Sequence, residues 1–312
     1  MRRKPAQQCD DRAHPSLLIL VLMVQQQVIM NAQSQPAVTV IVSTYNSPVH
    51  LLNTLAGFAV QTARLAELII ADDGSTDDTR EHVEKFCRTA PFTVRHFWQP
   101  DEGFRKPAIL NKAIDGADGN YILFTDGDCI PRSDFVAMHM AKATPGNFLS
   151  GGVEYLSAAA TARLGKEEII AQKIFEPAWL NANRERPRLI GKVNASRLMI
   201  AFARRLTTTR ASFNGHNTSA WRDDIVAVNG FDERMTYGGL DRELGERLNN
   251  YGVKGLSVRY DAIAVHQHHF RPYATSAGWR ANDLIRQETR RNRSVWTDSG
   301  LRSHGVSKRQ RN

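Results

Sequence analysis

The segment 38–42, with the sequence VTVIV, is the feature that most narrows what this chain can fold into. It is β-branched at every position and apolar at all but one, so either face of a strand built from it would be apolar. Such strands are typical of parallel sheets that helices cover on both sides. A polar break over 43–48 follows, and the amphipathic segment 51–61 after it predicts a helix. The order of these segments favours an α/β fold.

The same alternation continues as far as residue 124. Further strands are expected over 67–71, 93–97 and 121–124, and further helices over 76–88 and 107–117. Strands that alternate with helices in this way predict a Rossmann-like fold with a central, mostly parallel sheet. Ligands of such sheets bind beyond the carboxyl ends of the strands, so polar residues at those ends are candidates for a site.

The pattern changes along the chain and divides it into three parts. The large middle part contains a segment with weak strand signals and many basic residues, which predicts a helical insert or lid. The parts are a tail over 1–35, one domain over 36–270 with its insert at 150–210 between the halves 36–150 and 211–270, and a basic helix and tail over 271–312.

The first thirty residues allow three interpretations. Residues 1–4 are basic, and 17–24 form an apolar run that is too short to span a bilayer. The run could be the core of a signal peptide, but no clear small-residue cleavage site follows it. It could also be a tail without structure, or translation could begin at Met30. We favour a tail or a misplaced start over secretion.

Charge and cysteine usage limit the partners and the compartment. The net charge is +9 and the isoelectric point is near 9.7, which fits anionic partners such as nucleic acid, anionic lipid or sugar diphosphates, or simply a solvated basic surface. The three cysteines, Cys9, Cys87 and Cys129, lack the spacing of a metal site and indicate free thiols in a reducing compartment. No nucleic-acid recognition motif is present.

Two acidic motifs directly follow expected strands. The segment 72–75 (DDGS) could bind a nucleotide through its carboxylates, although it also suits a turn with a helix cap. The segment 126–128 (DGD) places two carboxylates one residue apart, where they repel each other. A divalent cation with oxygen ligands would relieve that repulsion. Read alone, this motif also fits a surface turn.

Two later motifs could carry proton or metal chemistry. Asp241 follows two glycines and falls in the first turn of an amphipathic helix, where a carboxylate could act as a general base or simply complement the helix dipole. The histidines at 266, 268 and 269 follow an apolar strand and could ligate a metal, although such clusters more often make surface or core hydrogen bonds.

Taken together, these motifs resemble those of the family 2 glycosyltransferases of the GT-A fold. The resemblance runs from about residue 38 to residue 269 and rests on 40–46 (VIVSTYN), 71–75 (ADDGS) and 126–128 (DGD). The segments 213–222 and 228–233 are similar to the galactosyltransferase-like C-terminal segment of bacterial chondroitin-type polymerases. The resemblance implies that 36–150 is the nucleotide-sugar half and 211–270 the acceptor half.

The resemblance also implies a donor site and a metal. The donor is expected to be a nucleotide sugar, with UDP as the nucleotide, and the metal to be Mn²⁺ or Mg²⁺ with Asp126, Asp128 and His266 as ligands and His268 as the alternative histidine. The implied donor residues are Thr44, Tyr45, Asn46, Asp72, Asp73, Arg105, Lys106, Asn111 and Asp126.

Asp241 stands where the family carries its catalytic base. The usual Glu-Asp pair is here Leu240-Asp241, which removes an acid that in relatives contacts the acceptor. The expected acceptor residues are Asn217, Trp221, Arg222 and Gly239.

The implied function is inverting, metal-dependent transfer of a sugar to a saccharide or lipid-linked acceptor in bacterial cell-surface polysaccharide synthesis. The alternative is a catalytically impaired protein that binds nucleotide sugars, which is suggested by Leu240 in place of the usual acid. The expected location is the cytoplasm, including the inner face of the membrane. A basic face for peripheral contact with anionic lipid would comprise Arg280, Arg286, Arg290, Arg291 and Arg293.

Overall fold

The computed structural model describes residues 36–186, 211–270 and 274–304, and every structural statement below refers to these. The expected tail with Cys9, the part of the expected insert after residue 186 and the last residues of the chain lie outside the described residues. Within the described ranges, no helix is long and apolar enough to cross a lipid bilayer.

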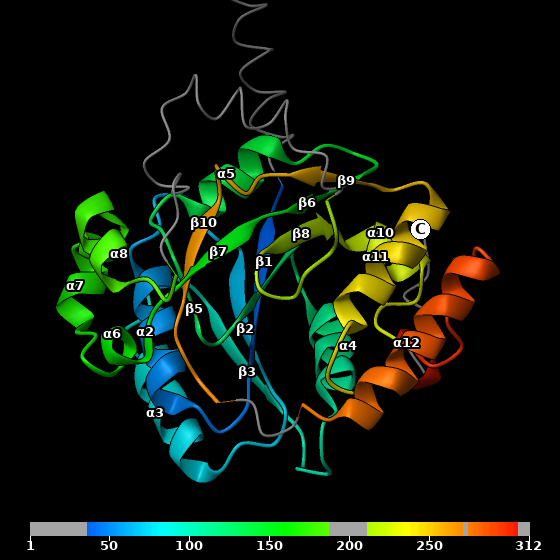
Figure 1. The fold of residues 1–312 in the computed structure, drawn as a ribbon, viewed down its shortest axis with the longest axis horizontal. Helices are drawn as coiled ribbons and strands as arrows, with labels where there is room; N and C mark the ends of the chain where they lie inside the picture. The colour runs from blue at the N-terminus through cyan, green and yellow to red at the C-terminus, as the bar shows by residue number, and fades with distance from the viewer. Residues whose placement is uncertain (1–35, 187–210, 271–273, 305–312) are drawn as a thin grey trace, which may run out of the picture. The chain divides into compact units, whose positions relative to one another are not determined.

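A seven-stranded sheet forms the centre of the fold (Figure 1). Its strand order is β3-β2-β1-β4-β8-β6-β9. The first four are parallel to one another, β8 runs antiparallel to both of its neighbours, and β9 is parallel to β6. The expectation of an α/β fold with a mostly parallel sheet is confirmed. The strands are β1 (Val38–Thr44), β2 (Glu67–Asp72), β3 (Val94–Trp98), β4 (Tyr121–Asp126), β6 (Asn147–Ser150), β8 (Thr218–Trp221) and β9 (Lys254–Ser257).

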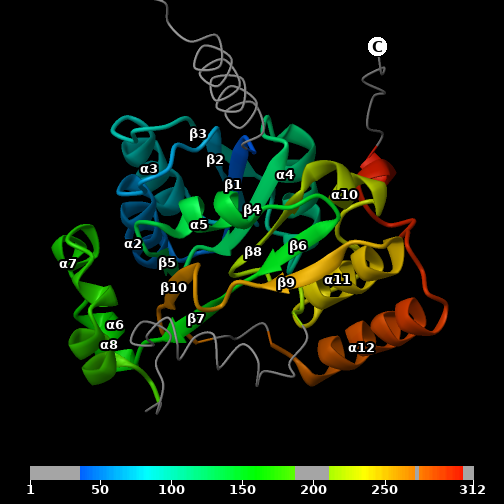
Figure 2. The same ribbon diagram turned by 90° about the horizontal axis from the view of Figure 1, so that it is seen from above.

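Helices cover both faces of this sheet. Figure 2 shows α2 and α3 on one side of the strands and α4 and α11 on the other. The helices around the sheet are α2 (Pro48–Ala59), α3 (Asp77–Cys87), α4 (Lys106–Gly116), α5 (Phe135–Lys142), α10 (Arg222–Ala227), α11 (Leu240–Tyr251) and α12 (Ser276–Arg291), and a 3₁₀ helix, η2 (Leu301–His304), follows them.

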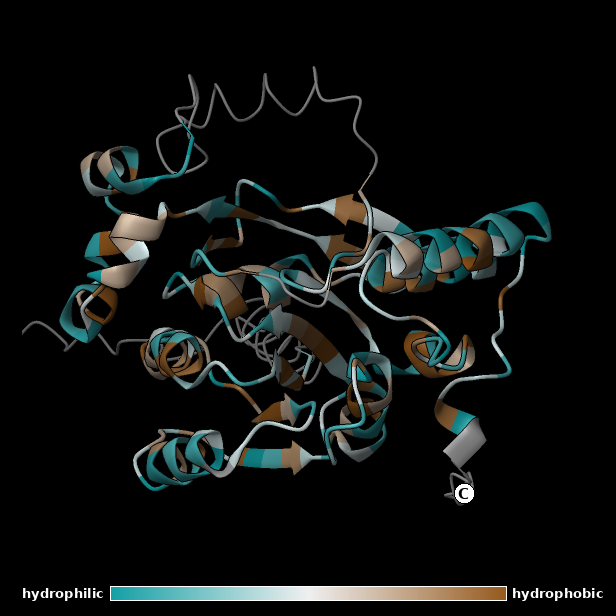
Figure 3. Ribbon diagram, turned by 60° about the horizontal axis from the view of Figure 1, so that its bottom comes forward, coloured by the Kyte–Doolittle hydropathy of each residue, from teal (hydrophilic) through white to brown (hydrophobic). Residues whose placement is uncertain are grey.

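Alternate residues of β1 belong to two different cores. Ile41 packs with residues of α4 and α11, whereas Val40 and Val42 pack with residues of α2, α3 and α5. All seven residues of β1 are therefore buried, which explains the unbroken β-branched run in the sequence. Figure 3 shows the apolar colour concentrated on the central strands and the hydrophilic colour on the outer surfaces of the helices.

The strand order changes direction at β1, and this positions the site. β2 lies on one side of β1 and β4 on the other, so the carboxyl ends of three parallel strands meet at one edge of the sheet. The register places Thr44 beside Asp72 and Ser43 beside Asp126. Open α/β sheets bind their ligands at such a reversal.

A second, three-stranded sheet extends from the same edge. In it β10 runs antiparallel to β5 and parallel to β7. The described part of the expected insert begins with strand β7 of this sheet and is helical after it, and its helices pack on the sheet through a third apolar cluster that includes Ile130 and Val265. The elements are β5 (Cys129–Pro131), β7 (Gly152–Tyr155), β10 (Ile263–His266), α6 (Ala158–Ala162), α7 (Lys166–Ile170), the 3₁₀ helix η1 (Lys173–Phe175) and α8 (Pro177–Asn183).

A fully buried ion pair joins α11 to its surroundings. Nη2 of Arg247 lies 2.7 Å from Oε2 of Glu243, one helical turn earlier, and both side chains are 1% exposed. The same nitrogen donates to the carbonyl of Gly230 at 2.7 Å. Thr289 of α12 donates to the other oxygen of Glu243 at 2.9 Å. The pair therefore connects α11, α12 and the loop after α10.

We expect Arg247→Met to lower the free energy of unfolding by about 3–5 kcal/mol, because it leaves the Glu243 charge buried without a cation. The double variant Arg247→Met/Glu243→Leu should recover part of that loss. Arg88→Met, at an exposed position after α3, is the control and should change stability by less than about 0.5 kcal/mol. Urea denaturation measures all three, and equal stability of Arg247→Met and Arg88→Met would contradict the expectation.

Candidate active site

A cavity of about 1250 Å³ opens at the strand reversal. Its walls come from the ends of β1 and β4, the loop before α4, the segment 213–216 and the start of α11. The end of β10 and the segment after it close one side. The cavity therefore combines residues from both halves of the domain.

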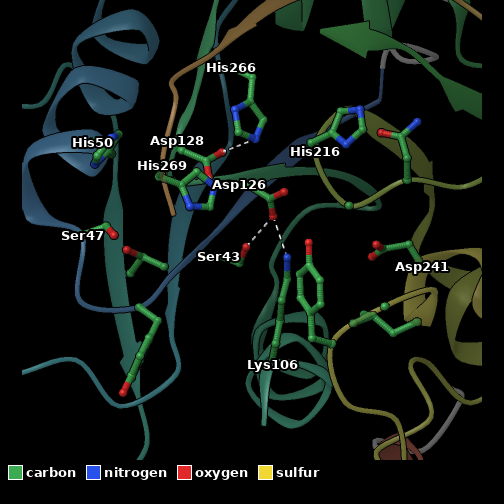
Figure 4. A pocket seen from close by; sticks show the side chains of 18 of the residues that line it. Ser43, Ser47, His50, Lys106, Asp126, Asp128, His216, Asp241, His266 and His269 are labelled. Atoms are coloured by element: carbon green, nitrogen blue, oxygen red, sulfur yellow. Dashed lines mark hydrogen bonds and ion pairs between the residues drawn. The ribbon is translucent and has the colours of Figure 1, made fainter. Parts of the chain in front are cut away.

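Asp126 ends β4 beside the end of β1. Ser43 Oγ donates to its Oδ1 over 2.8 Å, and Lys106 Nζ lies 2.6 Å from the same oxygen (Figure 4). Burial is the largest influence and would raise the pKa of Asp126, but the charge and hydrogen bond of Lys106, together with the charge of His216, lower the pKa. Burial would likewise lower the pKa of Lys106, but the carboxylates of Asp126, Asp241 and Asp128 raise it above its usual value. Both groups are therefore charged.

Asp128 lies beside two histidines from the other end of the domain. His269 Nε2 is 2.8 Å from Asp128 Oδ2, and His266 Nε2 is 3.5 Å from Oδ1 (Figure 4). The antiparallel pairing of β10 with β5 sets His266 opposite Cys129 and so brings it to Asp128. Burial would raise the pKa of Asp128, but the hydrogen bond from His269 and the charges of both histidines hold it well below its usual range.

The donor atoms around Asp128 fit a divalent cation. One carboxylate oxygen of Asp128, one ring nitrogen of His266 and the sulfur of Cys129 lie within 4.8 Å of one another. A carboxylate and imidazoles suit Mn²⁺ or Zn²⁺, and a bound diphosphate would add oxygens. The ring of His269 stacks on that of His266 with centroids 5.4 Å apart, so His269 could also supply a ligand to a cation beside Asp128. His268 is exposed and does not line the cavity.

Asp241 stands across the cavity from these groups (Figure 4). It is the second residue of α11, and Gly239 before that helix has φ +80°, a conformation that favours glycine. Oδ1 of Asp241 is buried without a hydrogen-bond partner among the described residues. Burial raises the pKa of Asp241 to about 6, although Lys106 partly opposes this. A Cβ on Gly215 would lie 2.7 Å from Oδ1, so only glycine leaves this oxygen room.

The structure brings most of the expected donor residues together, but not all of them. Asp72 uses Oδ1 to accept the N–H of Ser75 at 2.8 Å and Oδ2 to contact His96 at 2.9 Å, and it does not line the cavity. Its neighbour Asp73 does line it. The expected donor residues in the cavity wall are Thr44, Tyr45, Asn46, Asp73, Lys106 and Asp126.

Two more expected donor residues serve the framework. Arg105 pairs through its guanidinium with Glu102, and its backbone N–H donates to Asp73 at 2.8 Å. Asn111 exchanges two hydrogen bonds with the backbone of Phe231, at 2.9 and 2.8 Å, and so ties α4 to the loop after α10. Neither side chain lines the cavity.

Three of the four expected acceptor residues also lie away from the cavity. Asn217 donates to the carbonyls of Gly152 and Ala262, both at 3.0 Å, and joins the two sheets. Trp221 donates to the carbonyl of Thr144, and Arg222 bonds to carbonyls at the end of α4. Of the four, Gly239 lines the cavity.

Three aromatic side chains form one rim of the cavity, and the sequence did not predict that they would lie there. Phe104 and Tyr237 meet edge to face at 6.0 Å, and Tyr237 and Trp279 do so at 5.9 Å. All three line the cavity, and Trp279 is 46% exposed. The indole packs so closely on Gly238 that a Cβ there would lie 2.6 Å from it.

Helix α12 fixes this rim. Asn282 donates to the carbonyls of Thr236 and Gly238 at 2.8 and 2.7 Å, and accepts the N–H of Thr236 at 3.1 Å. The loop that leads to Asp241 is therefore held from α12. No motif marks this contact, because a single asparagine in a basic helix carries no sequence signal.

Two further cavity histidines, His50 and His216, were not among the predicted site residues. His50 and His216 line the cavity together with His266 and His269. His269 belongs to a cluster that the sequence does flag, but its choice over His268 depends on how the chain turns after β10. Burial lowers the pKa of His50, which favours a neutral ring beside Asp128.

Comparisons with known proteins agree with this geometry. The profile of a family described as "Glycosyl transferase family 2" matches residues 39–192. Chondroitin synthase from Escherichia coli is 28% identical over 244 residues, which are 73% of this chain and 34% of that protein. Validoxylamine A glucosyltransferase from Streptomyces hygroscopicus subsp. jinggangensis is 26% identical over 252 residues, which are 76% of this chain and 57% of that protein.

A solved structure shows the same fold. The mannosyltransferase PcManGT from Pyrobaculum calidifontis, in complex with GDP-Man and Mn²⁺, superposes with a TM-score of 0.53 at 19% identity, over 81% of this chain and 66% of that one.

The chain spans about a third to somewhat over half of the length of the two curated relatives. The resemblance to bacterial chondroitin-type polymerases is confirmed by the first of them. Through residues 39–192 the chain belongs to glycosyl transferase family 2, and the domain that contains them has the GT-A fold of glycosyltransferases.

Proposed function

We propose that the chain transfers a sugar from a UDP-linked donor to a hydroxyl of a saccharide or lipid-linked acceptor, with inversion at the anomeric carbon, in bacterial cell-surface polysaccharide synthesis. The observation that carries this proposal is the carboxylate of Asp241, whose Oδ1 is unpaired among the described residues and which faces the Asp126–Asp128 motif across one cavity. The family membership and the chondroitin synthase relative support the reaction class.

The donor would occupy the strand-end side of the cavity. Tyr45 and Asn46 lie at the end of β1, where an aromatic ring can stack on a base, and Asp73 can accept a hydrogen bond from it. Lys106 carries a charge that could neutralise phosphate once it turns from Asp126. The PcManGT complex, which contains a nucleotide sugar in a related fold, supports a donor of this class.

A divalent cation, Mn²⁺ or Mg²⁺, belongs to the same proposal. Asp128, His266 and His269 would hold it, with Asp126 beside them kept charged by Lys106. When bound, such a cation supplies Lewis-acid stabilisation of the negative charge on a departing diphosphate.

Asp241 would act as the general base. Its Oδ1 accepts the proton of the acceptor hydroxyl as that oxygen forms a bond to the anomeric carbon. The bond from that carbon to the diphosphate breaks with its electron pair on the leaving group, so the configuration inverts in one displacement. A pKa of about 6 suits this role, because the carboxylate is ionised at neutral pH and still basic enough to accept a proton.

The acceptor would bind against the aromatic row of Phe104, Tyr237 and Trp279. Apolar faces of sugar rings pack on aromatic side chains, and Trp279 offers an exposed indole at the rim. Leu240, where relatives carry an acid, is 4% exposed and packs with Leu244 and Leu248. Its departure from the family pattern supports a second candidate, a protein that binds nucleotide sugars without transferring them. Sugar transfer by the purified protein would exclude that candidate.

We also propose that the protein contacts the inner face of a cytoplasmic membrane. Arg286 and Arg290 of α12 pair with Glu246, at 2.6 and 3.3 Å, so they hold α12 to α11. Arg280, Arg291 and Arg293 are exposed and could face anionic lipid.

The metal site can be tested by titration with Mn²⁺ in the presence of UDP. Asp128→Ala and His269→Ala should each weaken Mn²⁺ binding by about tenfold or more, because each removes a ligand. His268→Ala, the matched control on the adjacent residue, should bind Mn²⁺ like the unmodified protein. Loss of binding in His268→Ala with none in His269→Ala would reverse the assignment.

Asp241→Asn should lower kcat by about 10²–10⁴-fold, since the amide cannot accept the proton, while calorimetry finds donor affinity little changed. In the unmodified protein, the active form is the carboxylate, so kcat/KM should fall as the pH drops below about 6. Undiminished transfer by Asp241→Asn would remove Asp241 as the base.

Trp279→Ala should raise the KM for the acceptor by about tenfold and leave the KM for the donor unchanged, because it deletes only the acceptor's stacking surface. Leu284→Ala, on an exposed part of the same helix, is the control and should change neither constant. Equal acceptor constants for the two variants would place the acceptor elsewhere.

A further inference from the structure

Arg184 places a guanidinium group with buried, unused hydrogen-bond donors in the wall of the cavity. It follows α8 directly, is 9% exposed, and lines the cavity. Its Nε and Nη1 atoms are buried and have no hydrogen-bond partner in the described part of the chain. An arginine stays protonated in proteins, so this charge is not relieved by losing a proton.

The contrast with Arg247 shows how unusual this is within the fold. Arg247 is also buried, and its nitrogens bond to the carboxylate of Glu243 and to backbone carbonyls. A buried guanidinium with unused donors destabilises the folded protein, and a ligand of opposite charge that enters the cavity offsets this. The position of Arg184 in a cavity wall makes such a ligand accessible.

The backbone fixes Arg184 near the proposed metal site. Arg184 bridges Leu156 in antiparallel fashion, and Leu156 N–H donates to the carbonyl of His266 at 2.9 Å. Arg184 is therefore one strand removed from β10, and neighbouring strands lie about 4.8 Å apart. Its backbone lies on the order of 10 Å from that of His266, within a distance that a nucleotide sugar spans.

We propose that Arg184 binds an oxyanion of the donor. This rests on the proposed function, in which the cavity takes a nucleotide sugar. The oxyanion is either the diphosphate or a carboxylate on the transferred sugar, because a guanidinium pairs with both through two parallel hydrogen bonds. In the second case Arg184 selects acidic sugars.

Arg184→Met keeps the length of the side chain and removes its charge, and Arg184→Lys keeps the charge but not the fork of donors. Arg163→Met is the matched control, since Arg163 belongs to the same helical segment, bonds to Asn183 and does not line the cavity. Calorimetry measures the binding of inorganic pyrophosphate, UDP-glucose and UDP-glucuronic acid to each protein, and thermal unfolding without ligand shows that each is folded.

If the diphosphate is the partner, Arg184→Met should weaken binding of all three ligands by about tenfold to a hundredfold, and Arg184→Lys should weaken it less. If the sugar carboxylate is the partner, only UDP-glucuronic acid should bind more weakly. Without ligand, Arg184→Met should melt no lower than the unmodified protein, because it removes a buried guanidinium with unused donors. Should Arg184→Met not fold, the same comparison is made with Arg184→Lys.

The proposal is overturned if the Arg184 variants bind all three ligands as Arg163→Met does, or if the unmodified protein binds none of them. Failure of the proposed function looks different, because sugar transfer is then absent although pyrophosphate or UDP-glucuronic acid still binds through Arg184.

Discussion

Mutual repulsion among three carboxylates is the constraint on which the site depends. Asp126, Asp128 and Asp241 face one cavity, and their charges would oppose folding if nothing compensated them. Lys106 pairs with Asp126, and two histidines contact Asp128. Oδ1 of Asp241 has no hydrogen-bond partner among the described residues, and burial, together with the charge of Asp126, raises the pKa of Asp241 to about 6 although Lys106 partly opposes this. Because neighbouring positive charges compensate the three carboxylates unequally, the pKa of Asp241 is raised whereas those of Asp126 and Asp128 are lowered.

The part of the candidate site at the ends of the parallel strands can be predicted closely from the sequence because its signals are local. Each parallel strand is a short apolar run, and the acidic motif that follows it must lie at the sheet edge once the strands align. The order of strands and motifs is therefore enough to bring Asp73, Asp126 and Asp128 to one cavity. It does not separate Asp72 from Asp73, since both lie at the end of the same strand and only the turn geometry decides which faces inward.

The part of the candidate site that comes from residues after 210 is harder to predict because it depends on long-range pairing. His269 reaches Asp128 through the antiparallel contact of β10 with β5, over a separation of 141 residues that no short motif encodes. Conversely, Asn217, Trp221 and Arg222 are conspicuous in the sequence, but they satisfy backbone carbonyls of the framework. A polar or aromatic residue near a motif supports the fold as readily as it contacts a ligand.

Helix α12 holds the loop before Asp241 through hydrogen bonds and packing, and these contacts affect how the site of such a domain can vary among relatives. Asn282 and Trp279 hold the backbone of residues 236–238 from outside the segment that the family profile matches. The chain thus divides into the strand edge with the proposed nucleotide site and the helix that positions Asp241 and the aromatic rim. Exchange of that helix alone would reshape the aromatic rim, and with it the proposed acceptor site, while the strand edge and the proposed donor site stayed as they are.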